Sequence, residues 1–119
     1  MEISQKPRLH KDLTPERWFK FSRMEQLANV GCDVIRAIQW KKRGNLEYSN
    51  DAFMRALELL TLTILDPKNK RRGCLRELCR MRETLVDHFM GDNEYNSTDE
   101  QWFNDFNDYS YAAAVQRGR

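Results

Sequence analysis

The segment NKRRGCLRELCRMRETLVDHFMG, residues 69–91, carries the clearest helical pattern of the chain. Its apolar residues recur every three or four positions, as on one face of an α-helix, at Leu75, Leu78, Leu85 and Phe89. Gly91 follows as a typical helix stop. The pattern predicts an amphipathic helix over about residues 69–90, with Arg82 in the middle of its apolar stripe.

Two helices are predicted near the N-terminus of the chain. Residues 14–16 (TPE) combine an N-cap threonine, a proline at the first helical position and an acid in the first turn, and they predict a short leading helix. Residues 22–25 (SRME) form a capping box. That box predicts a long helix over about residues 23–43, which Gly44 ends.

Two more helices complete the pattern. One is predicted over about residues 47–65, where Asp66-Pro67 ends it because proline excludes the helical conformation from the residue before it. The other is predicted over about residues 98–116, after a second capping box at residues 97–100 (STDE). Strand signals are almost absent.

The short loops between these helices predict antiparallel neighbours. The expected fold is therefore all-α, an antiparallel up-down-up-down four-helix bundle with a short leading helix. Residues 14–119 form its single domain. Residues 1–13 are polar and aperiodic, and we expect them to form a flexible N-terminal arm.

The composition is that of a soluble domain. The chain has 119 residues, of which 40% are apolar and 32% charged. No apolar run approaches the roughly 20 residues that a membrane-spanning helix needs, and the N-terminus has no apolar stretch typical of a secretion signal. We therefore expect a cytoplasmic protein without a membrane segment.

The cysteines and histidines do not have the spacing of metal ligands. The cysteines are odd in number and each falls within a helical pattern, which favours reduced, structural thiols at Cys32, Cys74 and Cys79. No CxxC or HxxxH pair occurs. We expect neither a metal nor a cofactor.

Charge is distributed unevenly along the chain. Residues 1–82 carry a net charge of +8 and residues 83–119 a net charge of −6. The last helix can neutralise the others on folding, or a basic surface can remain for a polyanion. The candidate residues for nucleic-acid binding are the cations of one short segment, Lys68, Lys70, Arg71 and Arg72. A solvated basic end is the alternative interpretation.

Arg82 is open to two interpretations. A buried guanidinium needs a partner, because an uncompensated charge inside a protein costs several kcal/mol. That partner can be a carboxylate on another helix, with Asp33, Glu58 and Asp105 as the candidates, a water channel or a bound ligand. His88, six positions later, points about 120° away on a helical wheel and lies nearer the edge of the stripe.

The spacing of these two residues resembles a known motif. Residues 82–88 (RETLVDH) resemble the Arg-x4–6-His motif of the HEPN superfamily, small helical proteins that include ribonucleases of toxin–antitoxin and defence systems. The resemblance implies a metal-independent ribonuclease or RNA-binding protein. Arg82 would then bind the RNA phosphate and His88 would transfer the proton. Residues 18–106 are also similar to a set of small bacterial helical proteins without an established activity.

Three functions are compatible with these patterns. The leading hypothesis is a non-enzymatic interaction module that forms a homodimer or binds a protein partner. The alternative is the HEPN-like RNA-binding protein or ribonuclease, which would require Arg82 and His88 to reach one phosphate. The third is small-ligand binding in a pocket around Arg82.

Overall fold

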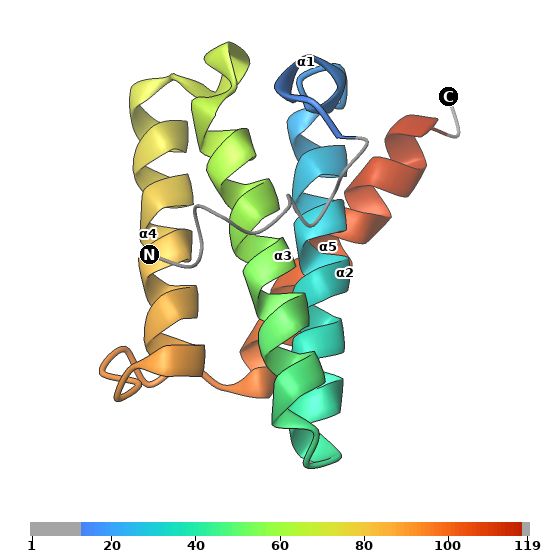
Figure 1. The fold of residues 1–119 in the computed structure, drawn as a ribbon. Coiled ribbons are helices and arrows are strands. Elements are labelled where there is room, and N and C mark those ends of the chain that lie inside the picture. Colours follow the sequence, from blue (N-terminus) through green and yellow to red (C-terminus); the bar gives the residue numbers. More distant parts are fainter. Residues whose placement is uncertain (1–12, 118–119) are drawn as a thin grey trace.

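The computed structural model describes residues 13–117, in which it contains helices and connecting loops and no strand (Figure 1). The elements are α1 (Pro15–Trp18), α2 (Arg23–Lys42), α3 (Leu46–Leu65), a 3-10 turn η2 (Pro67–Asn69), α4 (Arg72–Met90) and α5 (Asp99–Arg117). The all-α prediction is confirmed. The predicted flexible arm, apart from its last residue, lies outside the described residues.

Local signals place the start and the end of α2 correctly. The Ser22 hydroxyl accepts a hydrogen bond from the Glu25 N–H at 3.1 Å, and the Glu25 carboxylate accepts one from the Ser22 N–H at 3.0 Å. This reciprocal pair is the predicted capping box. At the other end, Gly44 adopts a φ of +84°, a left-handed conformation that favours glycine, and the chain turns there into α3.

The start of α5 differs from the prediction by one residue. The capping pair is Thr98 with Gln101, rather than residues 97–100: the Thr98 hydroxyl accepts from the Gln101 N–H at 3.2 Å, and the Gln101 side chain accepts from the Thr98 N–H at 2.9 Å. Ser97 is not available for this role because its hydroxyl contacts His88. The helix begins correspondingly later, at Asp99.

The start of α4 was also predicted wrongly. The helix begins at Arg72, whereas the sequence pattern predicted a start near residue 69. Asn69 is the reason, because its buried side chain donates hydrogen bonds to the Gln26 side chain at 3.0 Å and to the Thr63 carbonyl at 2.9 Å. This anchoring holds residues 67–69 in a 3-10 turn.

Asn69 belongs to a buried polar network that joins four elements. The Trp18 indole N–H donates to the Thr63 hydroxyl at 3.0 Å, and the Gln26 amide donates to the Asp66 carboxylate at 2.8 Å. The Lys68 ammonium also pairs with Asp66. Buried polar groups are costly unless they are hydrogen-bonded, so this network specifies how α1 and η2 attach to α2 and α3.

The apolar core lies mainly between α2 and α3, which pack most closely together, and α5 covers the other side of α2. Its fully enclosed side chains include Val30, Val34, Ile38, Phe53, Leu60 and Phe106. Gly31 marks the crossing of α5 over α2, because a Cβ atom there would meet the Phe106 ring at 2.6 Å. The missing side chain lets the two helices approach.

The helices are not arranged symmetrically. α2, α3 and α4 lie side by side, whereas α5 crosses α2 obliquely and moves away from α4 towards its C-terminal end (Figure 1). α4 packs closely on α3 alone. Only two of its residues, Leu78 and Leu85, are buried. The helix with the clearest apolar stripe is therefore incompletely covered.

The described residues show three further features that bear on function. None of the helices in residues 13–117 has the length and apolarity to cross a membrane. In the same range, His, Cys, Asp and Glu do not gather in groups of three or more that could hold a metal ion. All three cysteines are free thiols: Cys32 is exposed, and Cys74 and Cys79 are half-buried.

Candidate functional site

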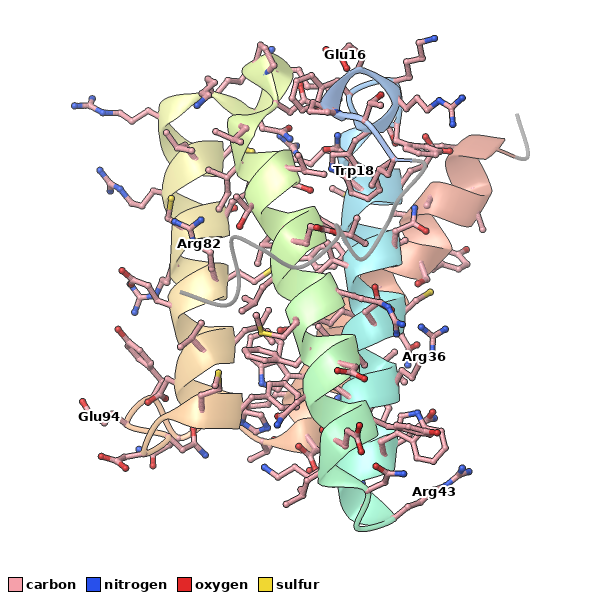
Figure 2. The ribbon with its side chains drawn as sticks, in the orientation of Figure 1. Glu16, Trp18, Arg36, Arg43, Arg82 and Glu94 are labelled. Atoms are coloured by element: carbon pink, nitrogen blue, oxygen red, sulfur yellow. The ribbon has the colours of Figure 1, made fainter. Side chains whose placement is uncertain are left out.

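Arg82 is half-buried on α4 and is not enclosed by the core (Figure 2). The reason is the exposed position of α4, whose stripe meets α3 on one side only. Among residues 13–117, Arg82 forms no ion pair with any of the three predicted acids, and Asp33 instead pairs with Arg36 at 2.7 Å. Within the described residues, therefore, Arg82 does not form the ion pair to another helix that was one of its two predicted roles.

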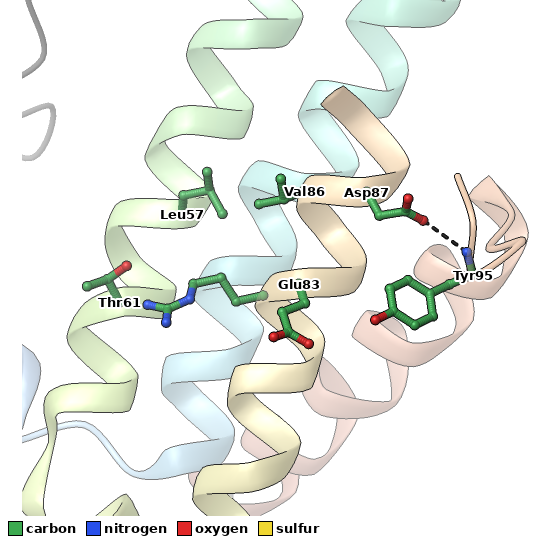
Figure 3. Close-up of a pocket in the computed structure, with 7 residues that line it drawn as sticks. Leu57, Thr61, Glu83, Val86, Asp87 and Tyr95 are labelled. Atoms are coloured by element: carbon green, nitrogen blue, oxygen red, sulfur yellow. Dashed lines mark hydrogen bonds between the residues drawn. The ribbon is translucent and has the colours of Figure 1, made fainter. Parts of the chain in front are cut away.

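Arg82 lines a groove of about 520 Å³ between α3, α4 and the loop that follows α4 (Figure 3). We call it the α3–α4 groove. Its lining residues are Leu57, Thr61, Arg82, Glu83, Val86, Asp87 and Tyr95. Apolar side chains therefore form much of its wall, and charged groups stand among them.

One of the two acids in the groove has a structural role. The Asp87 carboxylate accepts hydrogen bonds from the N–H groups of Glu94 at 2.8 Å and Tyr95 at 3.1 Å, and so holds the loop against the end of α4 (Figure 3). Glu83 is exposed and makes no such contact within the described residues. The charges that remain available in the groove are therefore those of Arg82 and Glu83.

His88 lies in a different environment, at the junction of α4 and α5. Its Nδ1 is 2.8 Å from the Ser97 hydroxyl, and its Nε2 is 2.9 Å from Asp99 Oδ1. Because a carboxylate only accepts, Nε2 is the donor in the second contact. The ring also packs edge-on against Phe89 and Trp102, at centroid distances of 5.1 and 6.2 Å. Both ring nitrogens are thus engaged.

The structure does not bring Arg82 and His88 into one site. The residues that line the groove with Arg82 and the residues that contact the His88 ring form two sets with no member in common. For both side chains to meet one phosphate, His88 would have to release its two hydrogen-bond partners.

The four predicted basic residues divide into two groups. The Lys68 ammonium pairs with the buried Asp66 carboxylate and donates to the Phe19 carbonyl at 2.9 Å, so Lys68 has a structural role. The other three cations, Lys70, Arg71 and Arg72, are exposed. They stand at the start of α4, where they remain available to a polyanion.

Comparison with known proteins does not identify a relative. No family model matches the chain, and neither a curated protein nor a solved structure does. Any inference about function therefore rests on the geometry of the site.

Most residues of the α3–α4 groove were not predicted from sequence. Thr61 and Tyr95 join Arg82 only because α3 and the loop after α4 fold next to it. The signal that could have found them is spacing, since Leu57, Thr61 and Leu65 recur every four residues on one face of α3. Besides the engaged Asp87, the groove offers the guanidinium of Arg82, the carboxylate of Glu83 and an apolar wall, which suits binding.

Proposed function

We propose that this chain is a cytoplasmic, non-enzymatic interaction module that forms a homodimer through the α3–α4 groove. The observation that supports this function most directly is Arg82, which is half-buried, lacks an ion-pair partner among residues 13–117, and stands next to the exposed Glu83. In a homodimer, a second copy of the chain would supply an oppositely charged partner to Arg82 and to Glu83.

Charge complementarity favours a second copy over an unrelated partner. In a two-fold symmetric dimer the same patch of both subunits meets. If the axis passes near residues 82–83 with the two α4 helices antiparallel, Arg82 of one copy faces Glu83 of the other, and symmetry repeats the contact. Desolvated pairs of this kind contribute specificity as well as affinity.

Apolar side chains around the groove supply the surface for such an interface. On α4 and the following loop, Met90 is 64% exposed and Tyr95 is 52% exposed. On α3, Leu65 is 52% exposed and extends the face of Leu57 and Thr61 by one turn. Two copies of the α3–α4 layer would bury this surface, and the two layers together would make an antiparallel four-helix arrangement.

The test is a charge swap measured by sedimentation equilibrium. Arg82→Glu and Glu83→Arg each place like charges opposite one another, and each should weaken the dimer by about tenfold or more. The double variant Arg82→Glu/Glu83→Arg restores opposite charges and should recover most of the affinity. Arg80→Glu is the matched control, because Arg80 is exposed and lies about 200° around the helix from Arg82.

Several outcomes would overturn the proposal. They are a wild-type chain that stays monomeric at its highest soluble concentration, a double variant that dimerises no better than the singles, and an Arg80→Glu variant that dissociates equally. Capture of a different protein by a monomeric chain would replace homodimerisation with a heteromeric role.

RNA binding is the second candidate, and one contact favours it. The hydrogen bond from Lys68 to the Phe19 carbonyl places the end of α1 next to η2. Arg17 of α1 and Lys20 just after it therefore share one pole of the molecule with the exposed cations at residues 70–72. Binding of a polyanion there would weaken steeply with salt, as counterion release requires.

This candidate is tested by retardation of single-stranded RNA at low salt. The variant Lys70→Gln/Arg71→Gln/Arg72→Gln should lose most of the retardation, and Arg55→Gln/Arg76→Gln/Arg80→Gln removes as many charges from elsewhere as a control. HEPN-like ribonuclease activity would further require cleavage by wild type that His88→Ala abolishes. Absence of both retardation and cleavage would exclude the RNA function.

A further inference from the structure

A second cavity lies on the other side of α4, between α2, α4 and α5. It has a volume of about 490 Å³ and shares no lining residue with the α3–α4 groove. Its lining residues come from the start of α2, the first half of α4 and, through Tyr109, α5. The C-terminal part of α5 diverges from α4 (Figure 1). Its volume is within the range of small-molecule sites, which commonly lie between the helices of a bundle.

The polar lining of this cavity is predominantly basic. Arg23 of α2 and Arg71 before α4 contribute two guanidinium groups, and Glu77 is the one acid among the lining residues. Among residues 13–117, no ion pair joins Glu77 to either arginine. The Arg23 guanidinium donates to the Cys74 sulfur at 3.2 Å. Sulfur is a weak acceptor, so most of the hydrogen-bonding capacity of Arg23 remains unused.

The rest of the lining is apolar and lies deeper in the fold. Its side chains come from α2 and α4, and two of them, Leu27 and Leu78, are buried core residues. The other two, Met24 and Met81, are half-buried. Methionine side chains adapt to ligands of different shape. The cavity therefore combines cations with an apolar floor.

Tyr109 of α5 adds a hydrogen-bond donor. Burial raises the pKa of its phenol above the ordinary value of 10.0, and the carboxylates of Asp105, Glu77 and Asp108 raise the pKa further, against the opposing charge of Arg23. The phenol is consequently neutral at physiological pH. A neutral phenol can donate its O–H to an anion.

We propose that the α2–α4–α5 cavity binds a small anionic amphiphile, with its charged head on Arg23 and Arg71 and its apolar chain over Leu27, Leu78 and Met81. The head is an anion because two guanidinium groups and a phenol donor line the cavity, and Glu77 is the one acid that lines it with them; Asp105 and Asp108 act on the phenol from outside the lining. The ligand is amphipathic because the cations and the apolar side chains share one cavity. Glu77 is exposed and would repel the head.

The proposal is tested by calorimetric titration with three probes that share a twelve-carbon chain. Laurate carries a carboxylate head, dodecyl phosphate a phosphate head and dodecanol no charge, all used below their aggregation concentrations. Wild type should bind laurate or dodecyl phosphate about tenfold or more tightly than dodecanol, since hydrogen bonds to charged groups are the stronger ones. The tighter of the two anions identifies the preferred head.

Two charge variants then locate the head. Arg23→Gln should remove the preference for the anionic probes over dodecanol, and Glu77→Gln should tighten anion binding by relieving repulsion. Arg80→Gln removes an exposed cation that does not line the cavity and should leave every affinity unchanged. Equal binding of charged and uncharged probes by wild type, or an unchanged preference in Arg23→Gln, would overturn the proposal.

A third variant is designed to fill the cavity and leave the fold intact. Gly73 lines the cavity, and a Cβ atom built there meets no atom within 4 Å. Gly73→Leu should therefore keep the helical circular dichroism and the cooperative unfolding of wild type while losing probe binding. A folded Gly73→Leu that binds laurate as wild type does, or a wild type that shows no saturable binding of any probe, would contradict the proposed site.

Discussion

The Phe106 ring of α5 occupies the space that a side chain at Gly31 of α2 would fill. A Cβ atom at position 31 would stand 2.6 Å from both Cβ and Cδ1 of Phe106, closer than such atoms approach in proteins. Both residues are buried. This contact sets how closely α5 crosses α2.

Gly31→Ala is expected to destabilise the protein by about 1–3 kcal/mol, because overpacking a filled core forces side chains and backbone to shift. The sign of the change in the free energy of unfolding is informative, since a glycine-to-alanine change in a helix without a clash stabilises the helix by up to about 1 kcal/mol. The measurement is urea unfolding followed by circular dichroism at 222 nm.

Gly73→Ala is the matched control, because it lies in a helix and has open space around its Cβ position. It should be neutral or stabilising by up to about 1 kcal/mol. Phe106→Leu in the Gly31→Ala background should recover part of the loss. Equal stability of wild type and Gly31→Ala would show that the two helices separate easily at this crossing.

Asp66 should make folding stability depend on acid pH. Burial by itself raises the pKa of its carboxyl, but hydrogen bonds from Lys68 and Gln26 and the charge of Lys68 outweigh it and hold the pKa below the ordinary value of 3.8. Because the pKa is lower in the folded chain than in the unfolded chain, the ionised carboxylate stabilises the fold at any pH above the ordinary pKa of 3.8. The contribution is lost as the pH falls through the folded-state pKa.

Asp66→Asn is therefore expected to be less stable than wild type by about 1–3 kcal/mol at pH 7, since it weakens bonds inside a buried network. The difference should narrow as the pH falls below about 5 and should go on narrowing until the pH passes below the folded-state pKa of Asp66, where wild type loses its charge. Urea unfolding at a series of pH values measures it. Asp51→Asn at an exposed site controls for net charge and should show no comparable trend.

The two neighbouring lysines provide a separate prediction. Lys68→Met removes the cation that pairs with Asp66 and donates to the Phe19 carbonyl, whereas Lys70→Met changes an exposed residue. The first should lower the thermal midpoint by several degrees, as expected for a loss of about 1–2 kcal/mol, and the second should leave it nearly unchanged. Equal midpoints would mean that water replaces the Lys68 contacts without loss.

The sequence predicted those features of the fold that depend on nearby residues. The capping box of Ser22 and Glu25 and the turn at Gly44 involve residues close together in the chain, so their signals are complete in a short window. The start of α4 was missed because it depends on Asn69, whose partners Gln26 and Thr63 are 43 and 6 positions away. No local pattern reports that contact.

The candidate site was only partly predictable for a similar reason. Spacing placed Arg82 within the stripe of α4, but its exposure depends on which helices cover that stripe. The path of α5 decides this. The spacing of Trp102, Phe106 and Ala113 predicts the buried face of α5, but it does not predict which helix that face meets. The α3–α4 groove could be recognised only once the positions of α3, α4 and the loop after α4 were known.

His88 is expected to be a structural residue that joins α4 to α5. His88→Ala would leave Ser97 and Asp99 without their partner and would remove ring packing against Phe89 and Trp102, so it should destabilise folding by about 1–3 kcal/mol. A double-mutant cycle with Asp99→Ala should give a coupling energy of about 0.5 kcal/mol or more, and Glu100→Ala, at an exposed neighbour, should give none. Urea unfolding of the variants measures both quantities. If His88→Ala instead keeps full stability and abolishes an RNA cleavage that wild type performs, the histidine serves catalysis and the homodimer proposal gives way to the ribonuclease.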